Sequence, residues 1–235
     1  MPSQAYSDFC AAWRGSNCQR CRLCDERAQL VLDRGTPGTG LVIVGEAPGQ
    51  DEDREGRCFV GKTGRYMDAA LREVGINSDV DCLMMNSVLC WPGKTAKGAQ
   101  AQPPEAALRA CRPRLVEQLR LAEPKVVALA GKYAVAGVLG LDTENERPIT
   151  QFAGRPVESS RFPGIVFLPM FHPSYASRNV DAVSEYTRQM RVLAALVKNI
   201  LVDKVPYTWC DLTGLGPGPG YCESAFLHRQ VDSHA

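Results

Sequence analysis

The stretch LVIVGEAPGQDED, residues 41–53, joins a short apolar run to a glycine-rich acidic turn. The run at 41–44 is typical of a buried β-strand, so the turn opens where that strand would end. Ligands of open α/β sheets bind at this edge, beyond the carboxyl ends of the strands. A few residues later, Phe59 stands among glycines that would let the backbone approach a flat ligand closely. The stretch therefore predicts a site for a planar polar molecule.

Three more short apolar runs follow the first and alternate with amphipathic segments. We expect strands over 41–46, 82–88, 125–130 and 165–170. We expect helices over 64–74, 104–121, 132–139 and 183–202, and an irregular hairpin over 151–161. This alternation is typical of a mainly parallel sheet that helices cover on both faces. The sequence thus predicts an α/β fold, a three-layer α/β/α sandwich with a central four-stranded, mainly parallel sheet.

The length and charge of the chain limit the classes of protein to which it can belong. A chain of 235 residues suits one α/β domain, and we expect a single domain over 1–203 and a Gly/Pro-rich tail over 204–235. Lysine and arginine total 27 against 26 acidic residues, so any nucleic-acid surface must be a local patch. The sequence contains no apolar run long enough to predict a membrane span, and its first residues lack the apolar core of a secretion signal. We expect a cytoplasmic protein.

The chain holds ten cysteines, which is many for its length. In a reducing compartment, metal binding is favoured over a disulfide framework. Cys18 and Cys21 have the two-residue spacing that lets adjacent thiolates bind one metal or cluster, and Cys24 follows at the same interval. Cys90 and Cys111 flank a loop rich in proline, glycine and alanine. The spacing alone leaves open which of these cysteines share a site.

Two polar residues stand near the ends of other expected strands. Asn86 offers a donor and an acceptor, as reading the amide edge of a nucleobase requires. His172 follows the last expected strand, where Pro173 and Ser174 would hold its ring in place to bond a developing anion. The turn at 45–49 lacks the GxGxxG spacing of a dinucleotide site and the lysine of a phosphate loop, which argues against binding of nucleotide phosphates.

The chain resembles the family 4 uracil-DNA glycosylases, the iron–sulfur type found in bacteria and archaea. The resemblance covers roughly residues 18–198. It rests on five motifs, in order and with similar spacing: GEAPG at 45–49, ED at 52–53, GRCFVG at 56–61, Asn86, and HPS at 172–174. Cysteines and pocket residues agree independently, so the match is more specific than any one motif.

The resemblance implies a uracil pocket, a metal cluster and a DNA contact. The uracil-binding residues would be Glu46, Ala47, Pro48, Phe59, Asn86 and His172. The cluster would be a four-iron, four-sulfur (4Fe-4S) cluster on Cys18, Cys21, Cys90 and Cys111, with Cys24 as the alternative to one of them. The DNA contacts would come from Ser174, Tyr175 and Arg178.

Each pocket residue then has an implied role. The backbone of 46–48 would line the pocket, Phe59 would stack on the base, and Asn86 would read its amide edge. His172 would bond the carbonyl oxygen on which negative charge grows. Glu52 would position the attacking water, with Glu46 as its competitor, so the implied catalytic residues are Glu52, Glu46 and His172.

The implied function is that of a DNA repair glycosylase. It would flip uracil out of single- or double-stranded DNA, remove it by hydrolysis and leave an abasic site. We expect a monofunctional mechanism, because no lysine occupies a motif position that could form an imine with the sugar. We also expect a monomer. The alternatives are a non-catalytic binder of damaged or abasic DNA, and a glycosylase for another deaminated or modified base.

The chain departs from the family pattern in three respects, one of which is its surplus of cysteines. Cys58 stands where relatives usually carry proline, so a thiol would border the pocket. The segment 91–110 is longer than in typical members and contains Lys94 and Lys97. It could be an added DNA-contacting loop or a solvated insertion. A related branch of the superfamily traps DNA on a histidine in this segment, and the absence of histidine there excludes that reading.

Overall fold

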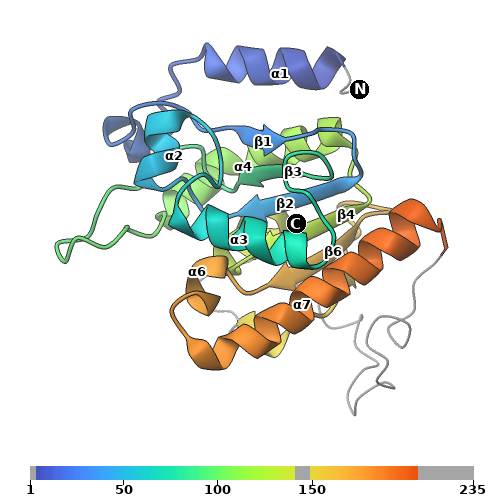
Figure 1. Cartoon of the computed structure of the whole chain (residues 1–235). Coiled ribbons are helices and arrows are strands. Elements are labelled where there is room, and N and C mark those ends of the chain that lie inside the picture. The colour runs from blue at the N-terminus through green and yellow to red at the C-terminus, as the bar shows by residue number, and fades with distance from the viewer. Residues whose placement is uncertain (1–3, 141–148, 206–235) are drawn as a thin grey trace.

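The structure, a computed structural model, describes residues 4–140 and 149–205 of the chain. In this part of the chain a central sheet lies between two layers of helices (Figure 1). The expected Gly/Pro-rich tail lies outside the described residues, apart from its first two positions. None of the described helices is both long and apolar enough to cross a membrane.

Within the described residues, six strands form one sheet, two more than expected. They are β1 (Asp33–Gly35), β2 (Leu41–Gly45), β3 (Leu83–Asn86), β4 (Val126–Ala130), β5 (Val157–Glu158) and β6 (Val166–Met170). Their order across the sheet is β1-β3-β2-β4-β6-β5. The four expected strands are the inner, parallel ones, whereas β1 and β5 pair antiparallel at the two edges. The edge strands escape prediction because they are three and two residues long and carry no apolar run.

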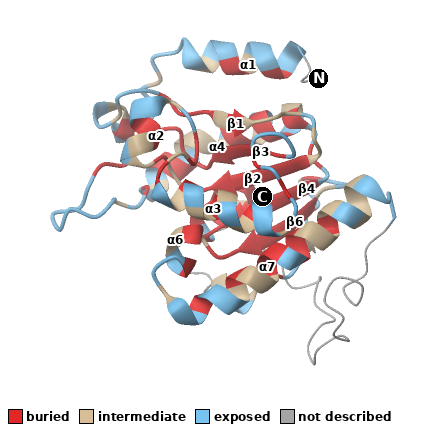
Figure 2. Cartoon of the chain, in the orientation of Figure 1, coloured by how far each residue is buried: buried red, intermediate tan, exposed pale blue. Residues whose placement is uncertain are grey.

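The inner strands are buried on both faces. In β2, Val42 and Val44 belong to one apolar core, and Leu41 and Ile43 belong to the other. Successive residues of a strand point to opposite faces, so an unbroken apolar run requires cover on both sides. Figure 2 shows these buried strands between helices that expose their outer faces. The apolar runs therefore explain the three-layer architecture.

Helices cover each face of this sheet. One face carries α1 (Gln4–Arg14), α4 (Glu105–Ala122) and α5 (Lys132–Leu139), and the other carries α3 (Lys62–Glu73) and α7 (Val183–Leu196). The short helices are η1 (Arg22–Asp25), α2 (Gln50–Glu55), η2 (Ile149–Gln151), α6 (Pro173–Ala176) and η3 (Val180–Ala182). A π-helical segment, η4 (Val197–Val202), continues α7. All four expected helices are present, and the described α-helices α1, α2 and α6 are additional.

Helix α2 replaces the turn expected after β2. It begins after Gly49, whose N–H donates to Glu52 Oε2 at 2.9 Å. Asp51, Glu52 and Asp53 lie in its first turn, where carboxylates stabilise the positive end of the helix dipole. Asp53 also accepts hydrogen bonds from Ala28 N–H at 2.8 and 3.0 Å, which ties the N-terminal segment to α2. Six residues are too few for an apolar period to reveal such a helix.

Because the inner strands are parallel, their carboxyl ends meet at one edge of the sheet. The loops that follow β2, β3, β4 and β6 therefore lie together there. Helices α2 and α6 stand at this edge in Figure 1. The expected site residues come from these same loops, so the topology alone brings them into one region.

Candidate active site

A cavity of about 230 Å³ opens at the carboxyl edge of the sheet. It receives residues from the loops after β2, β3 and β6 and from the start of α3. The residues that line it are Ala47, Gly49, Gln50, Asp51, Glu52, Phe59, Gly61, Lys62, Thr63, Gly64, Asn86, Gln100 and His172. Five residues expected from the sequence thus meet in one cavity: Ala47, Glu52, Phe59, Asn86 and His172.

Gly45 allows two of these side chains to meet. A Cβ atom at this position would lie 2.5 Å from Phe59 Cζ and 2.5 Å from Asn86 Oδ1. The aromatic ring and the amide therefore both pack directly on the Gly45 backbone at the end of β2. A side chain at Gly45 would push the Phe59 ring away from the Asn86 amide. A planar base with polar edges requires both a flat apolar group and a hydrogen-bonding group.

Phe59 adopts an unusual backbone conformation, with φ at +56°. Its carbonyl oxygen accepts a hydrogen bond from Arg34 Nη1 at 3.1 Å, and Arg34 is itself paired with Asp68. Gly64 packs so closely that a Cβ atom there would lie 1.9 Å from Phe59 O. A left-handed φ is uncommon outside glycine and is kept only where surrounding contacts impose it. The ring is buried, with 5% of the residue exposed, so its place is fixed before any ligand binds.

His172 presents a defined hydrogen-bond donor. Its Nδ1 accepts from Ser174 N–H at 3.3 Å and lies 2.7 Å from Ser174 Oγ. A backbone N–H can only donate, so Nδ1 carries no proton and the neutral ring holds its proton on Nε2. Burial, followed by the nearby Arg178, lowers the pKa of His172 to about 4. At neutral pH the ring is therefore uncharged and offers an Nε2–H donor.

Glu52 joins the two loops that form one wall of the cavity. Its Oε2 accepts from Gly49 N–H at 2.9 Å, and its Oε1 accepts from Gly61 N–H at 2.8 Å. The side chain is buried. Each carboxylate oxygen thus already binds a backbone amide, so Glu52 fixes the start of α2 relative to the start of α3.

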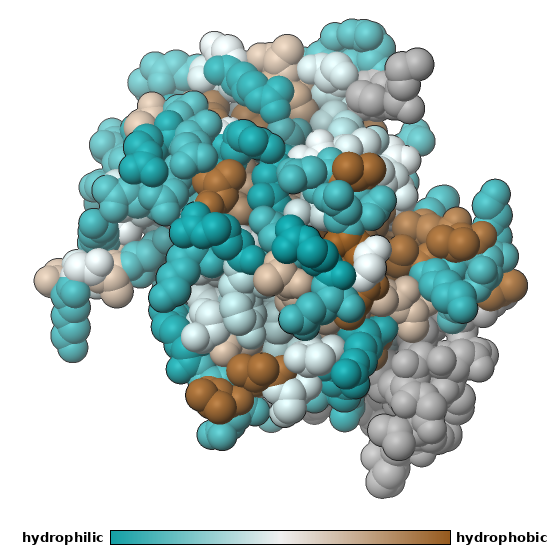
Figure 3. Space-filling model, in the orientation of Figure 1, coloured by the Kyte–Doolittle hydropathy of each residue, from teal (hydrophilic) through white to brown (hydrophobic). Residues whose placement is uncertain are grey.

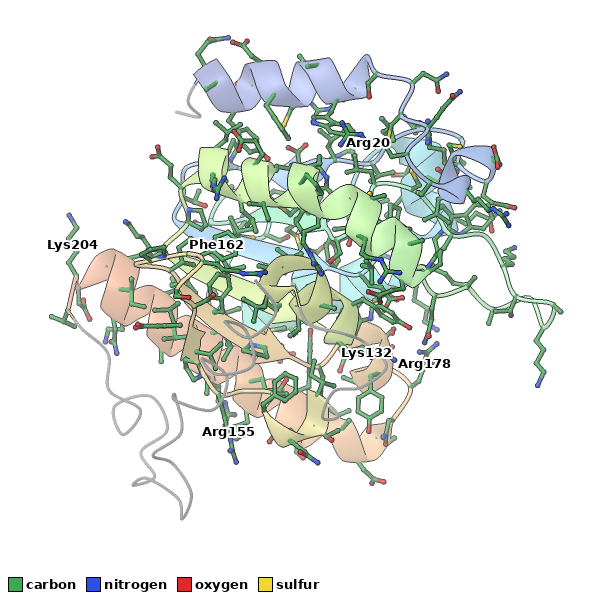
Figure 4. The ribbon with its side chains drawn as sticks, turned by 180° about the vertical axis from the view of Figure 1, so that it is seen from behind. Arg20, Lys132, Arg155, Phe162, Arg178 and Lys204 are labelled. Atoms are coloured by element: carbon green, nitrogen blue, oxygen red, sulfur yellow. The ribbon has the colours of Figure 1, made fainter. Side chains whose placement is uncertain are left out.

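Glu46 lies beside the cavity rather than among the residues that line it. Burial raises the pKa of its carboxyl to about 7, although the cations Lys132 and Arg178 act in the opposite direction. Figure 4 labels these two cations, which lie near each other at this end of the molecule. Glu46 is therefore a partly buried carboxyl that titrates near neutral pH.

Cys58 lies directly against the amide of Asn86. The Sγ atom accepts from Asn86 Nδ2 at 3.6 Å, within the longer range of sulfur hydrogen bonds. The thiol is fully buried, and burial raises its pKa well above the usual range. It therefore stays protonated and acts as a neutral neighbour of Asn86. The Asn86 carbonyl oxygen accepts from Arg114 Nη2 at 3.1 Å, which fixes the backbone there.

The three residues expected to contact DNA lie on and after α6. Ser174 bonds His172, and Arg178 Nη2 donates to Ser174 Oγ at 3.4 Å. Tyr175 packs edge-on against Phe171, with ring centroids 5.2 Å apart, yet leaves 43% of its surface exposed. One cation and one exposed aromatic residue thus stand next to the histidine.

Sequence reasoning misses several residues that line the cavity. Gln100 comes from the long segment between Cys90 and Cys111, and its Nε2 donates to Pro48 O at 3.2 Å. Its only sequence signal is the unusual length of that segment. The remaining unpredicted lining residues come from the first turns of α2 and α3: Gln50, Asp51, Lys62 and Thr63. They enter because both helices begin at the cavity wall.

A second cluster, which we call the cysteine corner, consists of Cys18, Cys21, Cys90 and Cys111. Burial raises the pKa of the Cys21 and Cys90 thiols, and the proximity of Cys111 raises both further. Cys18 lies close enough to Cys21 to act in the same direction. All eight cysteines in the described part of the chain are free thiols. No three His, Cys, Asp or Glu side chains of the described residues are placed to hold a single metal ion.

Nitrogen donors face the sulfur atoms of the cysteine corner. Arg27 Nη1 lies 3.5 Å from Cys90 Sγ, and the guanidinium of Arg114 lies close to Cys111. Arg114 is buried, and its Nε has no hydrogen-bond partner. Cys24 instead bonds the adjacent Asp25 at 3.5 Å. The cysteine corner thus contains a buried hydrogen-bond donor, Arg114 Nε, that has no acceptor within the described residues. Cys24 lies at the margin of the corner.

Comparisons with known proteins agree with this geometry. A family model described as the uracil DNA glycosylase superfamily matches residues 32–195. The type-4 uracil-DNA glycosylase of Sulfurisphaera tokodaii is 30% identical over 192 residues, which are 80% of this chain and 84% of that protein. That of Thermotoga maritima is 34% identical over 166 residues, which are 71% and 81%. That of Archaeoglobus fulgidus is 25% identical over 181 residues, which are 77% and 88%.

The matched region contains the cavity and all six strands of the described sheet, and the predicted family is confirmed. The α/β class is confirmed with it, in a mixed sheet of six strands. The chain belongs to the uracil-DNA glycosylase superfamily and, within it, to the type-4 uracil-DNA glycosylases.

Proposed function

We propose that the protein removes uracil from DNA by hydrolysing the N-glycosidic bond and leaves an abasic site. One observation carries the proposal: a stacking ring, an amide and a neutral histidine donor meet in one cavity of a type-4 uracil-DNA glycosylase fold. The products are free uracil and a sugar that has gained a hydroxyl from water. This places the protein in base excision repair as a hydrolase.

Recognition of uracil uses the flat face and the polar edge of the base. Phe59 stacks on the ring, which positions the base without selecting its edge. Asn86 supplies a donor and an acceptor to one edge of the base. His172 donates Nε2–H to a carbonyl oxygen of uracil.

The reaction separates charge between the two halves of the substrate. When the bond between C1′ and the base breaks, the electron pair stays on uracil and positive charge develops on the sugar. A neutral donor is suited to the leaving anion, because its hydrogen bond strengthens as the oxygen becomes negative. Water then adds to C1′ and loses one proton. No covalent intermediate with the protein is required.

Glu46 is the better candidate for the carboxylate that orients this water. Both oxygens of Glu52 already accept backbone hydrogen bonds, which suits it to shape the cavity wall. The Glu46 carboxyl has a pKa of about 7, and a general base works best when its pKa lies near the working pH. We therefore propose Glu46 for the water and Glu52 for the wall.

The nucleotide must leave the base stack to reach the cavity, at a cost of a few kcal/mol. Arg178 places a cation beside the histidine, and Tyr175 places an exposed ring there. We propose that Arg178 binds a phosphate, that Ser174 orders the turn, and that Tyr175 faces the vacated stack. Single- and double-stranded DNA are both candidate substrates, and a cytoplasmic monomer remains our expectation.

The cysteine corner fits a polynuclear iron–sulfur cluster. In a 4Fe-4S cluster each thiolate binds a different iron atom, so its four ligands need not converge on one ion. The donors from Arg27 and Arg114 suit sulfur atoms that carry negative charge. We propose that Cys18, Cys21, Cys90 and Cys111 hold this cluster, which would tie the N-terminal segment to the start of α4. Hydrolysis transfers no electron, so the tie is structural.

An oligonucleotide with a single uracil tests the proposal. We expect the purified protein to release free uracil and to leave an alkali-labile site at that position. A matched oligonucleotide with thymine controls for recognition of the base edge. Tight binding without release of uracil would identify a non-catalytic binder, and release of another deaminated base alone would change the substrate.

A further inference from the structure

The segment between β3 and α4 forms a tight β-hairpin over 93–101, which we call the 93–101 hairpin. Ala101 N–H donates to Gly93 O at 3.0 Å, and Thr95 N–H donates to Ala99 O at 2.7 Å. A bridge joins Lys94 to Gln100. These bonds give a defined shape to a segment for which the sequence allows two interpretations, a DNA-contacting loop or a solvated insertion.

The hairpin is attached to the rim of the cavity. Gln100 lines the cavity and donates to Pro48 O at 3.2 Å. Just beyond the hairpin, Gln102 accepts a hydrogen bond from Tyr133 at the start of α5. Figures 1 and 3 show the segment projecting from the body of the molecule at the edge where the strands end. Its base is thus fixed next to the site, while its tip reaches outward.

The charge of the hairpin has one sign. Lys94 and Lys97 are exposed, and the sequence 91–104 contains no acidic residue. At the same edge, Lys62 lines the cavity and Lys132 and Arg178 lie beside Glu46. The overall charge of the chain is only +1, and the cavity is lined by Asp51 and Glu52 as well as Lys62, so the charge of one sign belongs to the hairpin and not to the whole edge.

We infer that the 93–101 hairpin is a DNA-binding arm that contacts backbone phosphates next to the flipped nucleotide. This inference rests on the proposed function. Phosphate contacts position a protein on DNA without reading sequence, and a hairpin fixed at its base loses little freedom when it binds. Because Gln100 belongs to both the hairpin and the cavity wall, a strand bound along the hairpin lies next to the cavity.

The test compares two double variants that remove the same charge. Lys94→Ser with Lys97→Ser removes the cations of the hairpin. Lys125→Ser with Lys198→Ser removes two exposed lysines from the far end of the sheet, where Lys125 directly precedes β4 and Lys198 lies near Leu201, which packs on Gly40. The probe is a labelled duplex that carries a tetrahydrofuran abasic-site analogue, titrated over a range of salt concentrations.

We expect the hairpin variant to bind this duplex about tenfold more weakly at low salt and to lower the slope of log K against log salt by about 1 to 2. The control variant should keep wild-type affinity and slope. Under single-turnover conditions with saturating protein, both variants should remove uracil at the wild-type rate, and inhibition by free uracil should be unchanged.

Equal affinity and equal salt slope in the two variants would overturn the inference and leave the hairpin as a solvated insertion. A slower saturating rate in the hairpin variant would also overturn it, because the hairpin would then serve the chemical step. If the wild-type protein binds the abasic duplex but releases no uracil, the proposed function fails. The binding comparison still decides the role of the hairpin in that case.

Discussion

The cavity and the cysteine corner differ in how many of their polar groups form hydrogen bonds within the protein. Around the cavity, hydrogen bonds within the protein already fix His172 Nδ1, both oxygens of Glu52 and the backbone of Phe59. In the cysteine corner, the thiols are free and the buried Arg114 Nε has no partner. The cavity is therefore complete as folded, whereas the proposed cluster would complete the corner.

This difference predicts two kinds of failure. A substitution of a cavity side chain that contacts the base should remove chemistry and leave the fold intact, because neighbouring side chains do not depend on a bound group. A substitution in the cysteine corner should lower the free energy of unfolding and leave the geometry of the cavity unchanged in the protein that remains folded. Measuring activity and unfolding on the same variants separates the two.

His172→Ala should give the largest loss of activity. Loss of one donor to a developing anion lowers kcat about 100- to 1000-fold, while the unfolding midpoint should change little. Single-turnover release of uracil measures the first effect, and thermal unfolding measures the second. Ser174→Ala is the matched control, since it keeps the imidazole and removes one of its partners, and should cost less. A fall in stability as large as the fall in rate would contradict the separation.

The pKa of about 4 at His172 adds a pH test. A pKa lowered on folding means that the ring stays neutral until the pH falls towards 4, so Nδ1 keeps accepting the hydrogen bond from Ser174 N–H that orients the ring. In a Glu46→Gln background, activity should therefore stay level between about pH 5 and 8. A loss of rate as the pH falls through the ordinary histidine range would show that the ring is not buried as described.

Cys90→Ala should give the largest loss of stability. We expect loss of bound iron and a decrease of about 3 kcal/mol in the free energy of unfolding, because a ligand and its buried packing both disappear. Iron content, visible absorbance and denaturant unfolding are the measurements. Cys24→Ala should keep the iron and shift stability by less than about 0.5 kcal/mol. Loss of iron in the Cys24 variant would instead make Cys24 a ligand.

Glu46→Gln should lower the rate about tenfold at pH 8 and remove its dependence on pH near 7. The carboxylate form increases as the pH rises through the pKa of about 7, so wild-type activity should rise over that interval. The matched variant Glu52→Gln should keep the pH dependence and lose about 1 to 2 kcal/mol of stability, because one backbone amide loses its acceptor. A flat wild-type profile would exclude Glu46 as the base.

The same pKa predicts the sign of a stability change. The folded pKa of Glu46 lies above its usual value, so the folded state binds the proton more tightly than the unfolded state. The stability that this proton contributes is complete at low pH and is lost as the pH rises through about 7. Glu46→Gln should therefore be more stable than wild type above pH 7, by about 3 kcal/mol at most. Denaturant unfolding at two pH values measures this.

Cys58 variants should give the smallest effect. Cys58→Ala removes the acceptor of Asn86 Nδ2, so the amide loses one orientation constraint and KM should rise two- to fivefold, roughly the value of one weak hydrogen bond. Cys58→Ser keeps an acceptor and should stay closer to wild type. Equal kinetics for the alanine and serine variants would show that the sulfur only fills space.

The sequence predicts the inner sheet and the main helices because their signals are local. The four inner strands are apolar runs that need cover on both faces, and the main helices carry apolar residues at helical spacing. Parallel strands then bring their carboxyl ends to one edge, so Asn86 and His172 are predicted to lie near the turn after β2. The resemblance to the family 4 uracil-DNA glycosylases identifies them as pocket residues, because it rests on the order and spacing of motifs in the sequence.

Only the tertiary structure decides how these residues are prepared for chemistry. The positive φ of Phe59 depends on Arg34 and Gly64, and the neutral tautomer of His172 depends on the Ser174 N–H in the turn that follows it. The pKa of Glu46 depends on burial at the sheet edge. The position of Gln100 depends on the 93–101 hairpin, which no periodic pattern in the sequence predicts. A sequence specifies which groups are present and along which strand they lie. Protonation, conformation and mutual distance come from neighbours far away in the chain, so they exist only once the layers have packed.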